Sequence, residues 1–329
     1  MFCIGKSWIG IIEIEYPLGV NYLQTKFKQF IMNTVLNIQS VSKAYGKIQA
    51  LNGVSFGVPQ GSVFGILGPN GSGKTTLLSI ILDVLKADNG NFLWFGEPGS
   101  PTQRKKIGSL LETPNFYHYL SAVDNLRITH SISGRGSMAD IEKVLQKVKL
   151  YERRNSSFKT YSLGMKQRLA IAAALLGSPS VLVLDEPTNG LDPVGIAEIR
   201  ELIVELKNSG HTIIMASHLL DEVEKVCTHA AILKTGKLLT TGPVDEILMD
   251  EDVVEIGATN LDALRNAVNG LSQKIVLNTE TQTLQLSFAK GTANLEDINA
   301  LCFSKGITLN HLVSRKKRLE ARFFELTNN

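Results

Sequence analysis

A glycine-rich turn followed by a lysine and a threonine is the segment with the clearest chemistry. Residues 68–75 read GPNGSGKT and match the spacing G-x-x-x-x-G-K-[ST]. Glycines let consecutive backbone N–H groups turn toward phosphates, and the following helix adds the partial positive charge of its N-terminus. Lys74 supplies a point charge near the β- and γ-phosphates, and the Thr75 hydroxyl can hold Mg²⁺. The segment predicts binding of a nucleoside triphosphate; the alternative is an ordinary glycine turn before a helix. The residues expected to contact the nucleotide here are Gly68, Pro69, Asn70, Gly71, Ser72, Gly73, Lys74, Thr75 and Thr76.

A pair of adjacent carboxylates closes a second apolar run. Residues 181–184 read VLVL and are followed by Asp185 and Glu186. Carboxylates are a costly way to end a buried strand, and neighbouring strand side chains point to opposite faces. We therefore expect the two residues to have different tasks. Asp185 would hold Mg²⁺, and Glu186 would orient and deprotonate a water that attacks the γ-phosphate. The alternative is a strand-end pair that accepts backbone hydrogen bonds before the turn at Pro187.

Strand and helix patterns alternate around these segments. Short β-favouring runs are separated by Gly, Pro and Gln, and after Gly73 the apolar residues recur at helical spacing. We expect strands at 36–41, 53–58, 62–67, 107–111, 181–184 and 212–216, and helices at 141–150, 166–176 and 193–207. Asp192 is a suitable N-cap, Pro193 suits the first helical position, and Gly210 follows the end. The alternation predicts an α/β fold with a mostly parallel sheet wrapped by helices.

The pattern changes after Asp250, where shorter elements follow one another. We expect strands at 253–256, 274–277, 283–287 and 307–313, and helices at 261–268 and 295–301. Residues 251–329 are therefore interpreted as a small accessory α+β domain, for which a ferredoxin-like topology is one arrangement. The basic run 315–318 is interpreted as the solvated start of a terminal helix rather than a nucleic-acid site, because it lacks interleaved aromatic residues.

Residues 1–31 do not resemble a signal peptide. Their apolar stretch, residues 8–12, is only five residues long and is closed by Glu13 and Glu15, whereas a signal peptide needs about seven to fifteen. We expect these residues to form a weakly ordered extension and Met32 to be a candidate start, so that the main domain spans 32–250. The alternative is a short amphipathic arm that packs on this domain.

The composition excludes several classes of protein. Of the 329 residues, 43% are hydrophobic and 20% are charged, which is far from the signature of disorder. The charge difference, 34 − 31 = +3, is too small to indicate a nucleic-acid or anionic-membrane surface. The cysteines Cys3, Cys227 and Cys302 lie far apart, which excludes a disulfide framework and a zinc ribbon and fits a reducing cytosol. No run reaches the roughly 18 apolar residues of a spanning helix.

The motifs together resemble those of the ATP-binding cassette (ABC) ATPases. The segments GPNGSGKT at 68–75, YSLGMKQR at 161–168, LDEPT at 184–188 and ASH at 216–218 occur in the order of that family. The similarity covers about 32–250. It implies a P-loop NTPase fold with a small antiparallel β subdomain and a helical subdomain that carries the signature segment 161–165.

The resemblance assigns further residues to the site. In this family the signature serine and second glycine, here Ser162 and Gly164, contact the γ-phosphate held by the opposite subunit, and a helix N-terminus completes that anion site. His218 resembles the switch histidine, which would act with Lys74 and Glu186 as a catalytic residue. Asp192 lies in a segment that resembles the D-loop at the dimer interface, and Tyr45 resembles the aromatic that stacks on adenine. The alternatives are a simple capped helix start at Ser162 and a helix-capping role for His218.

The sequence departs from the family pattern at Glu112 and Leu163. Glu112 stands where the family usually has glutamine, and it can still ligate Mg²⁺ together with Thr75 and Asp185. Leu163 replaces the first signature glycine and adds apolar bulk. Together with Phe116 and Tyr117, both replacements resemble the multidrug and peptide-antibiotic export branch, of the bacitracin-resistance type.

The resemblance implies the cytoplasmic ATP-binding and ATP-hydrolysing subunit of an export transporter, with ATP and Mg²⁺ as cofactors. Two copies would sandwich ATP, and a separate permease would place them at the cytoplasmic face of the membrane, docking near 112–125. The cargo would be a drug, a peptide antibiotic or a lipid-like molecule, and no nucleic-acid partner is expected. One alternative is a soluble ABC-family ATPase acting on ribosomes or DNA, which would normally need two cassettes or a long coiled coil. A regulatory ATP-binding module with little turnover is another.

Overall fold

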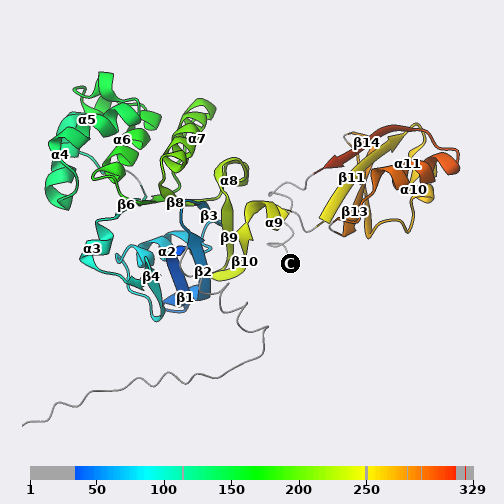
Figure 1. Ribbon diagram of the computed structural model, residues 1–329, viewed down its shortest axis with the longest axis horizontal. Helices are drawn as coiled ribbons and strands as arrows, with labels where there is room; N and C mark the ends of the chain where they lie inside the picture. The colour runs from blue at the N-terminus through cyan, green and yellow to red at the C-terminus, as the bar shows by residue number, and fades with distance from the viewer. Residues whose placement is uncertain are drawn as a thin grey trace, which may run out of the picture.

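The computed structural model describes residues 34–112, 115–248, 251–279, 281–289, 291–315 and Phe323. The expectations for residues 1–31 lie outside these described residues. Within them, the strands form three sheets, two in residues 34–248, here called the cassette after the resemblance, and one in the C-terminal unit that begins at Glu251 (Figure 1). No helix in the described part of the chain combines the length and the apolar character needed to cross a bilayer.

The first sheet is small and antiparallel, as the sequence predicts. Its strands follow the order β2-β1-β4-β5. They are β1 (Thr34–Tyr45), β2 (Ile48–Pro59), β4 (Asn89–Trp94) and β5 (Glu97–Pro98). Leu36 on β1 pairs with Val58 on one side and Trp94 on the other, and all three are buried. The sheet packs on the central sheet, where the rings of Phe56 and Phe64 stack with centroids 5.2 Å apart.

The central sheet has six strands in the order β10-β9-β3-β8-β7-β6. They are β3 (Val63–Leu67), β6 (Ile107–Leu110), β7 (Val181–Asp185), β8 (Thr212–Ser217), β9 (His229–Lys234) and β10 (Lys237–Pro243). All neighbours are parallel except the edge pair β10 and β9. Because parallel strands end at the same edge, Leu67, Asp185 and Ser217 are brought together, and this edge is where open α/β sheets bind ligands.

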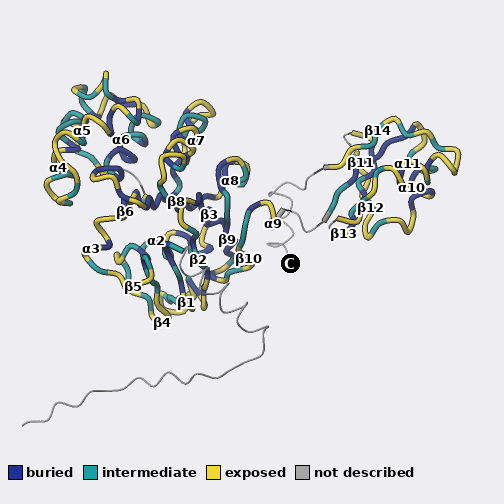
Figure 2. Tube along the Cα trace, in the orientation of Figure 1, coloured by how far each residue is buried: buried dark blue, intermediate teal, exposed yellow. Residues whose placement is uncertain are grey.

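Helices cover both faces of the central sheet (Figures 1 and 2). They are α2 (Lys74–Ile81), α3 (Pro101–Arg104), α4 (Ala122–Ser133), α5 (Met138–Lys147), α6 (Leu163–Leu175), α7 (Pro193–Asn208), α8 (Leu220–Val226) and α9 (Val244–Leu248), with 3₁₀ turns at Tyr151–Arg153 and Phe158–Thr160. Alternate residues of β7 enter separate cores: Leu182 and Leu184 pack with α4 to α7, whereas Val181 and Val183 pack with α2. The helices expected at 166–176 and 193–207 correspond to α6 and α7. Four elements, α4, β4, β9 and β10, were not expected from the sequence.

The C-terminal unit has the ferredoxin-like order of elements. It contains β11 (Glu251–Ala258), α10 (Leu261–Ala267), β12 (Lys274–Asn278), β13 (Thr283–Ala289), α11 (Leu295–Ser304) and β14 (Leu309–Arg315). The strand order β12-β13-β11-β14 has antiparallel neighbours throughout, and α10 and α11 pack on one face. Arg315 ends β14, so the expectation that it begins a terminal helix is wrong; residues 316–318 lie outside the described part.

Candidate functional site

The glycine-rich turn joins β3 to α2 and folds back on its own lysine. Lys74 is only 6% exposed, and its Nζ donates to the carbonyl oxygens of Gly68 at 2.8 Å and Pro69 at 3.3 Å. The helix α2 begins directly at Lys74, has no side-chain N-cap bond and has no acidic residue in its first turn. The first N–H groups of α2 and the ammonium group of Lys74 are therefore both at the turn, an arrangement that suits a bound phosphate.

The turn can be built only with glycine at its two ends. A Cβ at Gly68 would lie 2.3 Å from Ser72 Oγ, and one at Gly73, where φ is +103°, would lie 2.4 Å from the carbonyl oxygen of Ala50. Ser72 is buried, and its Oγ has no hydrogen-bond partner among the described residues. The close packing explains the glycine spacing and brings the backbone near to any ligand held by the turn.

Asp185, at the end of β7, is a buried carboxylate with one oxygen that could still accept a hydrogen bond or bind a metal ion. It is 3% exposed, and its Oδ1 has no hydrogen-bond partner within the described part of the chain. Burial raises the pKa of Asp185 above its ordinary value, and a hydrogen bond with the Thr75 side chain lowers it. The negative charges of Glu186 and Glu112 also raise this pKa, whereas the positive charge of Lys74 lowers it. The side chains of these residues therefore lie close to Asp185. Hydroxyl and carboxylate oxygens are the ligands that Mg²⁺ prefers, so the donor set fits this ion.

Glu186 lies between a cation and an imidazole. Its Oε2 is 2.8 Å from Nδ1 of His218, and its Oε1 is 3.6 Å from Nζ of Lys74. The backbone of Glu186 has φ of +47°, a region that non-glycine residues adopt rarely and often at functional sites. Its N–H donates to the carbonyl oxygen of Ala216 on β8, which fixes this turn to the neighbouring strand. The carboxylate is 21% exposed, so a water or a substrate can reach it.

The signature residues face outward. Ser162 caps α6, and its Oγ accepts a hydrogen bond from the backbone N–H of Met165 at 3.3 Å. Apart from its chain neighbours and the backbone of α6, no atom of the described residues lies within 4 Å of a Cβ built at Gly164, so there is space above it. Leu163 is 50% exposed, and its Cδ2 lies 3.3 Å from a Cβ built at Gly190, where φ is +74°. The side chain of Leu163 therefore lies close to Gly190, two residues before Asp192 in the same chain.

Tyr45 and Asp192 lie at two other exposed positions. Tyr45 ends β1, is 50% exposed, and has Lys43 Nζ 6.0 Å from its ring centroid. Asp192 caps α7, and its Oδ1 accepts from the N–H of Gly195 at 2.8 Å. An N-cap role for Asp192 is thus present in the single chain, and an interface role is compatible with its exposure.

One chain brings together only part of the expected site. Residues 68–76 meet Asp185, Glu186 and His218 at the same sheet edge, and Glu112 acts on the pKa of Asp185. No hydrogen bond or ion pair between described residues joins Ser162, Gly164 or Asp192 to this group. Thr188, two residues after Glu186, was given no role from the sequence. It is buried, and its Oγ1 has no partner among the described residues. Thr188 is the last residue of the LDEPT segment, and this was the feature of the sequence that could have indicated a role for it.

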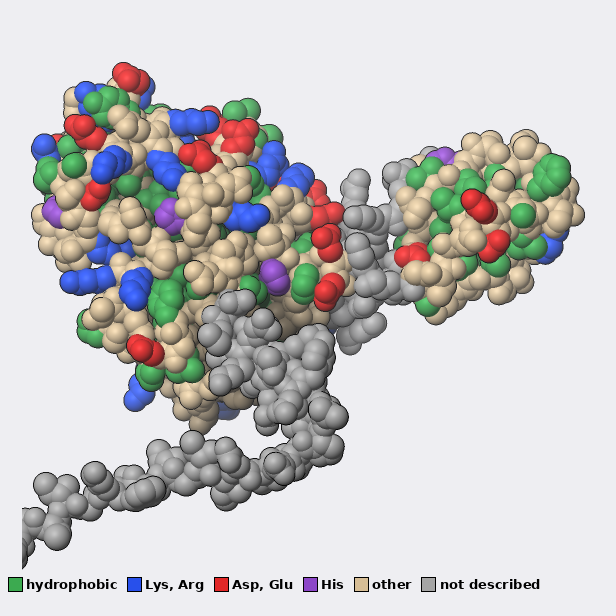
Figure 3. Space-filling view, in the orientation of Figure 1, with side chains coloured by type: hydrophobic (Ala, Val, Ile, Leu, Met, Phe, Trp, Pro, Cys, Tyr) green, Lys and Arg blue, Asp and Glu red, His purple; other side chains and the backbone are tan. Residues whose placement is uncertain are grey.

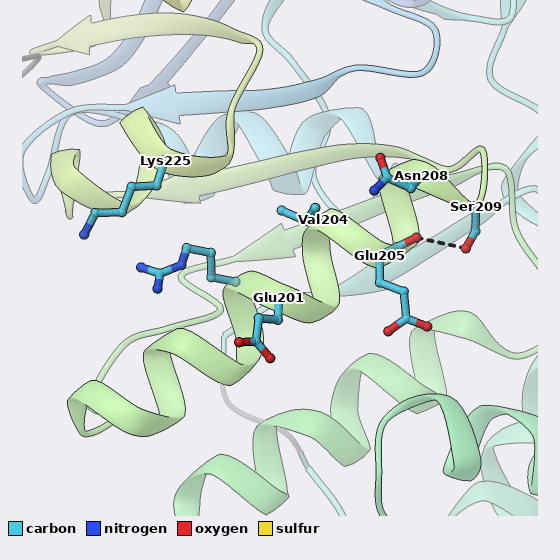
Figure 4. Close-up of a pocket in the computed structure, with 7 residues that line it drawn as sticks. Glu201, Val204, Glu205, Asn208, Ser209 and Lys225 are labelled. Atoms are coloured by element: carbon cyan, nitrogen blue, oxygen red, sulfur yellow. Dashed lines mark hydrogen bonds between the residues drawn. The ribbon is translucent and has the colours of Figure 1, made fainter.

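A surface hollow of about 830 Å³ lies along α7 and α8, with Arg200, Glu201, Val204 and Lys225 in its wall (Figure 4). Nη1 of Arg200 is 3.5 Å from Oε2 of Glu222 on α8. This contact braces the helix after Asp192 against the helix after His218. Basic and acidic side chains are interspersed on the face shown in Figure 3.

Comparisons with known proteins identify the family. Residues 51–189 match the model of the ABC transporter family. The lantibiotic transport ATP-binding protein SrtF of Streptococcus pyogenes is 40% identical over 70% of this chain and 96% of its own length. The bacitracin transport ATP-binding protein BcrA of Enterococcus faecalis is 38% identical over 66% of this chain and 72% of its own. The ADP conformation of MJ1267, an ATP-binding cassette of an ABC transporter, is 28% identical with a TM-score of 0.59, covering 65% of this chain and 92% of that one.

The chain belongs to the ABC transporter family and is one of its ATP-binding proteins. The predictions of the family, the P-loop fold and an ATPase subunit of an ABC transporter are therefore confirmed. The relatives give no support to the alternative of a soluble ATPase acting on ribosomes or DNA.

Replacing Asp185 by asparagine is expected to stabilise the nucleotide-free protein at neutral pH. Its folded pKa is raised above the ordinary 3.8, so the folded state binds the proton more tightly than the unfolded state. Stability is therefore lost as pH rises from 3.8 through the raised folded pKa, and asparagine avoids that loss. Denaturant midpoints in EDTA should show an advantage of Asp185→Asn that grows from about pH 4 to pH 7. The exposed Asp221→Asn variant is the control; an advantage that shrinks with pH would contradict the account.

Proposed function

We propose that this chain supplies the energy for an exporter by binding Mg²⁺–ATP, pairing with a second copy and hydrolysing the nucleotide. The cargo of the named relatives, a lantibiotic and bacitracin, supports a peptide antibiotic or a similar amphipathic molecule as the class of cargo. A separate permease carries it, and the ATPase sits on the cytoplasmic face of the membrane through that permease. Closure of the pair on ATP is a ligand-driven population shift, and hydrolysis with phosphate release reopens it.

The observation that carries the proposal is the placement of Glu186 between Lys74 and His218. The Glu186 Oε2 atom is 2.8 Å from His218 Nδ1, and its Oε1 atom is 3.6 Å from Lys74 Nζ. The carboxylate therefore lies beside Lys74, the cation that would bind the γ-phosphate. A carboxylate in hydrogen-bond reach of a water can take its proton as the water attacks. His218 fixes the carboxylate and is itself near the position of the γ-phosphate. Lys74 balances charge on the β- and γ-phosphates.

Mg²⁺ is assigned to oxygen ligands at the same sheet edge. Thr75 would offer its hydroxyl, Asp185 its unpartnered Oδ1, and Glu112 a carboxylate in the position of the usual glutamine. When bound, the ion neutralises phosphate charge and relieves the repulsion among Asp185, Glu186 and Glu112. Glu112 is exposed, so an ion can reach its carboxylate.

A second copy would complete the site, because no hydrogen bond or ion pair between described residues joins the N-terminus of α6 to the turn at 68–75 of the same chain. Ser162 and Gly164 are at the surface, and the N-terminus of a 13-residue helix lies behind them. In an isologous pair each chain offers this surface to the nucleotide of the other. Asp192 lies at the same interface, and Tyr45 stacks on the adenine.

The permease is assigned to the surface after Glu112. Tyr117 and Tyr119 are 50% and 73% exposed, with ring centroids 6.1 Å apart. Exposed aromatic side chains are enriched at protein interfaces because they bury much apolar area while keeping a polar group. Co-expression with a membrane protein encoded beside this chain should give a co-purified complex with ATPase activity. Recovery on ribosomes or DNA, with no membrane partner, would contradict the assignment.

Replacing Glu112 by glutamine is expected to leave ATP affinity nearly intact. The change removes one negative charge from the surroundings of Asp185 but keeps an oxygen ligand, and residues 68–75 are untouched. Titration with a fluorescent ATP analogue should give a Kd within about threefold of wild type. The matched control is Glu142→Gln, an exposed position on α5. A large loss of ATP affinity in Glu112→Gln but not in Glu142→Gln would contradict the assignment of Glu112 to the position of the usual glutamine.

A further inference from the structure

One edge of the sheet in the C-terminal unit is apolar and open. In the strand order β12-β13-β11-β14, β12 is an end strand, and among the described residues it pairs with β13 alone. Its three middle residues, Ile275, Val276 and Leu277, are apolar, and Val276 and Leu277 are 42% and 45% exposed. The outer N–H and C=O groups of an end strand have no partner within the sheet, so β12 can accept a further strand.

The other end strands carry features that discourage such pairing. Strands β2, β10 and β14 have shifts of register against their neighbours, and they end at Pro59, Pro243 and Arg315. Strands β5 and β6 are only two and four residues long. Proteins use proline, charge, irregular register and short strands to protect exposed edges. Strand β12 has neither proline nor glycine, its register against β13 is continuous, and its one charged residue, Lys274, is at its first position.

Leu277 lies on the core face of the sheet, but the core of a single chain does not cover it. Ile275 and Leu277 are opposite Leu286 and Leu284 of β13, which belong to the core shared with α10 and α11. Opposite residues of an antiparallel pair lie on the same face, so Ile275 and Leu277 are on this face as well. Ile275 packs against the core, whereas Leu277 stays 45% exposed. A further strand beside β12 would bury this apolar surface.

The sequence of β12, KIVLN, is complementary to itself in the antiparallel direction. When two copies meet about a two-fold axis through Val276, Ile275 of each lies opposite Leu277 of the other, and Lys274 lies opposite the uncharged Asn278. Apolar residues are thus opposite apolar residues, and no like charges meet. A two-fold contact uses the same surface of both chains. The pattern therefore favours a second copy of this chain as the occupant of the edge.

We propose that β12 pairs antiparallel with β12 of a second copy, which joins the two C-terminal sheets into one. Ile275 of each copy then covers Leu277 of the other on the core face, and the two Val276 side chains are neighbours on the opposite face. The pairing uses neither ATP nor a residue of the cassette, so it does not depend on the proposed function. A strand of five residues buries much less than the roughly 1,200 Å² of a stable interface, so the pairing is weak and single chains prevail at micromolar concentration.

Disulfide trapping of the full chain at submillimolar concentration tests the pairing. Opposite Cα atoms of an antiparallel pair are about 4.5–5.5 Å apart, a separation that a disulfide bridges. All variants carry Cys3→Ser, and Cys227 and Cys302 are buried. With copper phenanthroline as oxidant, Val276→Cys should form a covalent dimer about tenfold faster, or more, than Val313→Cys. Val313 is the matched control, because it is 38% exposed and lies in the same row of paired residues at the opposite edge, on β14.

Second-site variants of the Val276→Cys chain test the apolar contact. Leu277→Lys places a charge opposite Ile275 of the other copy and should reduce crosslinking to the rate of Val313→Cys. Val204→Lys, at a position on α7 that is 39% exposed, should leave the rate unchanged. Lys74→Ala should also crosslink at the unchanged rate, which separates this pairing from the ATP site.

The proposal is overturned if Val276→Cys crosslinks no faster than Val313→Cys, or if a folded Leu277→Lys leaves the rate unchanged. A crosslink of Val276→Cys to a different protein in cell extract, with none to itself, would also overturn it. If Val276→Cys fails to fold by circular dichroism, light scattering of the wild type decides instead. Its mass should rise from 36.0 kDa toward twice that value between micromolar and millimolar concentration, and Leu277→Lys should abolish the rise. A mass that does not rise would overturn the proposal.

Discussion

Glu186→Gln is expected to slow ATP hydrolysis by about 10²- to 10⁴-fold while ATP binding persists. Glutamine keeps the size of the side chain but cannot take a proton from water. The residues that would hold the phosphates, Lys74 and the turn that begins at Gly68, are unchanged, since Lys74 donates to backbone carbonyls as well as approaching Glu186. The loss should therefore appear in kcat, with little change in the affinity for ATP.

Phosphate release under saturating Mg²⁺–ATP measures this effect, and an equilibrium titration measures the affinity. Glu205→Gln, on the exposed side of α7, is the control for a general effect of removing one carboxylate. Undiminished turnover in Glu186→Gln would remove Glu186 as the base. An equal loss in Glu205→Gln would show that the effect is not local.

Lys74→Ala is expected to abolish tight nucleotide binding. Lys74 carries the buried ammonium group of the turn. We expect this group to donate charge-assisted hydrogen bonds to the β- and γ-phosphates. Loss of two charge-assisted hydrogen bonds corresponds to about 3 kcal/mol or more, and so to an affinity at least ~100-fold weaker. Alanine also leaves the carbonyl oxygens of Gly68 and Pro69 without this donor, which loosens the turn.

Titration with ATP and with ADP measures this loss, and circular dichroism checks the fold. Lys86→Ala, at an exposed position beyond α2, is the matched control and should bind as the wild type does. ATP affinity within threefold of wild type for a folded Lys74→Ala would contradict the assignment of the turn. A similar loss in Lys86→Ala would point to a non-specific effect of charge.

The parts of the site that contiguous residues encode could be predicted from the sequence. The turn at 68–75 and the pair Asp185 and Glu186 carry their spacing, their flanking strand and their helix start within a few residues. The N-cap at Asp192 was predictable for the same reason, because a capping residue acts on N–H groups three residues away.

Contacts between distant residues could not be predicted in the same way. Glu186 and His218 are 32 residues apart, and only the order of strands β7 and β8 brings them to 2.8 Å. Glu255 and His311 are 56 residues apart and meet through the pairing of β11 with β14. The likeness to a family supplied the role of His218, which no local pattern around that residue indicates.

The missed elements have local causes. Helix α4 begins after the N-cap Ser121 and has Asp124 in its first turn, which are good start signals. Its apolar residues are diluted by polar ones such as Asn125 and Arg127, so the helical periodicity is weak. The antiparallel edge strand β10, residues KLLTTGP, has glycine and proline within its last residues, which argue against a strand in isolation. At Arg315 the pairing of β14 with β11 extends the strand into a basic run that was expected to start a helix.

The mass of Glu186→Gln in solution, measured by light scattering with Mg²⁺ and ATP, tests the central claim most directly. If two copies hold ATP between residues 68–75 of one and Ser162 of the other, the mass should rise from 36.0 kDa to about twice that value with ATP. It should stay at 36.0 kDa with ADP, and also with ATP when Ser162→Arg is added. A mass that does not change with ATP, alone or with the permease present, would contradict the claim, as would equal pairing with Ser162→Arg.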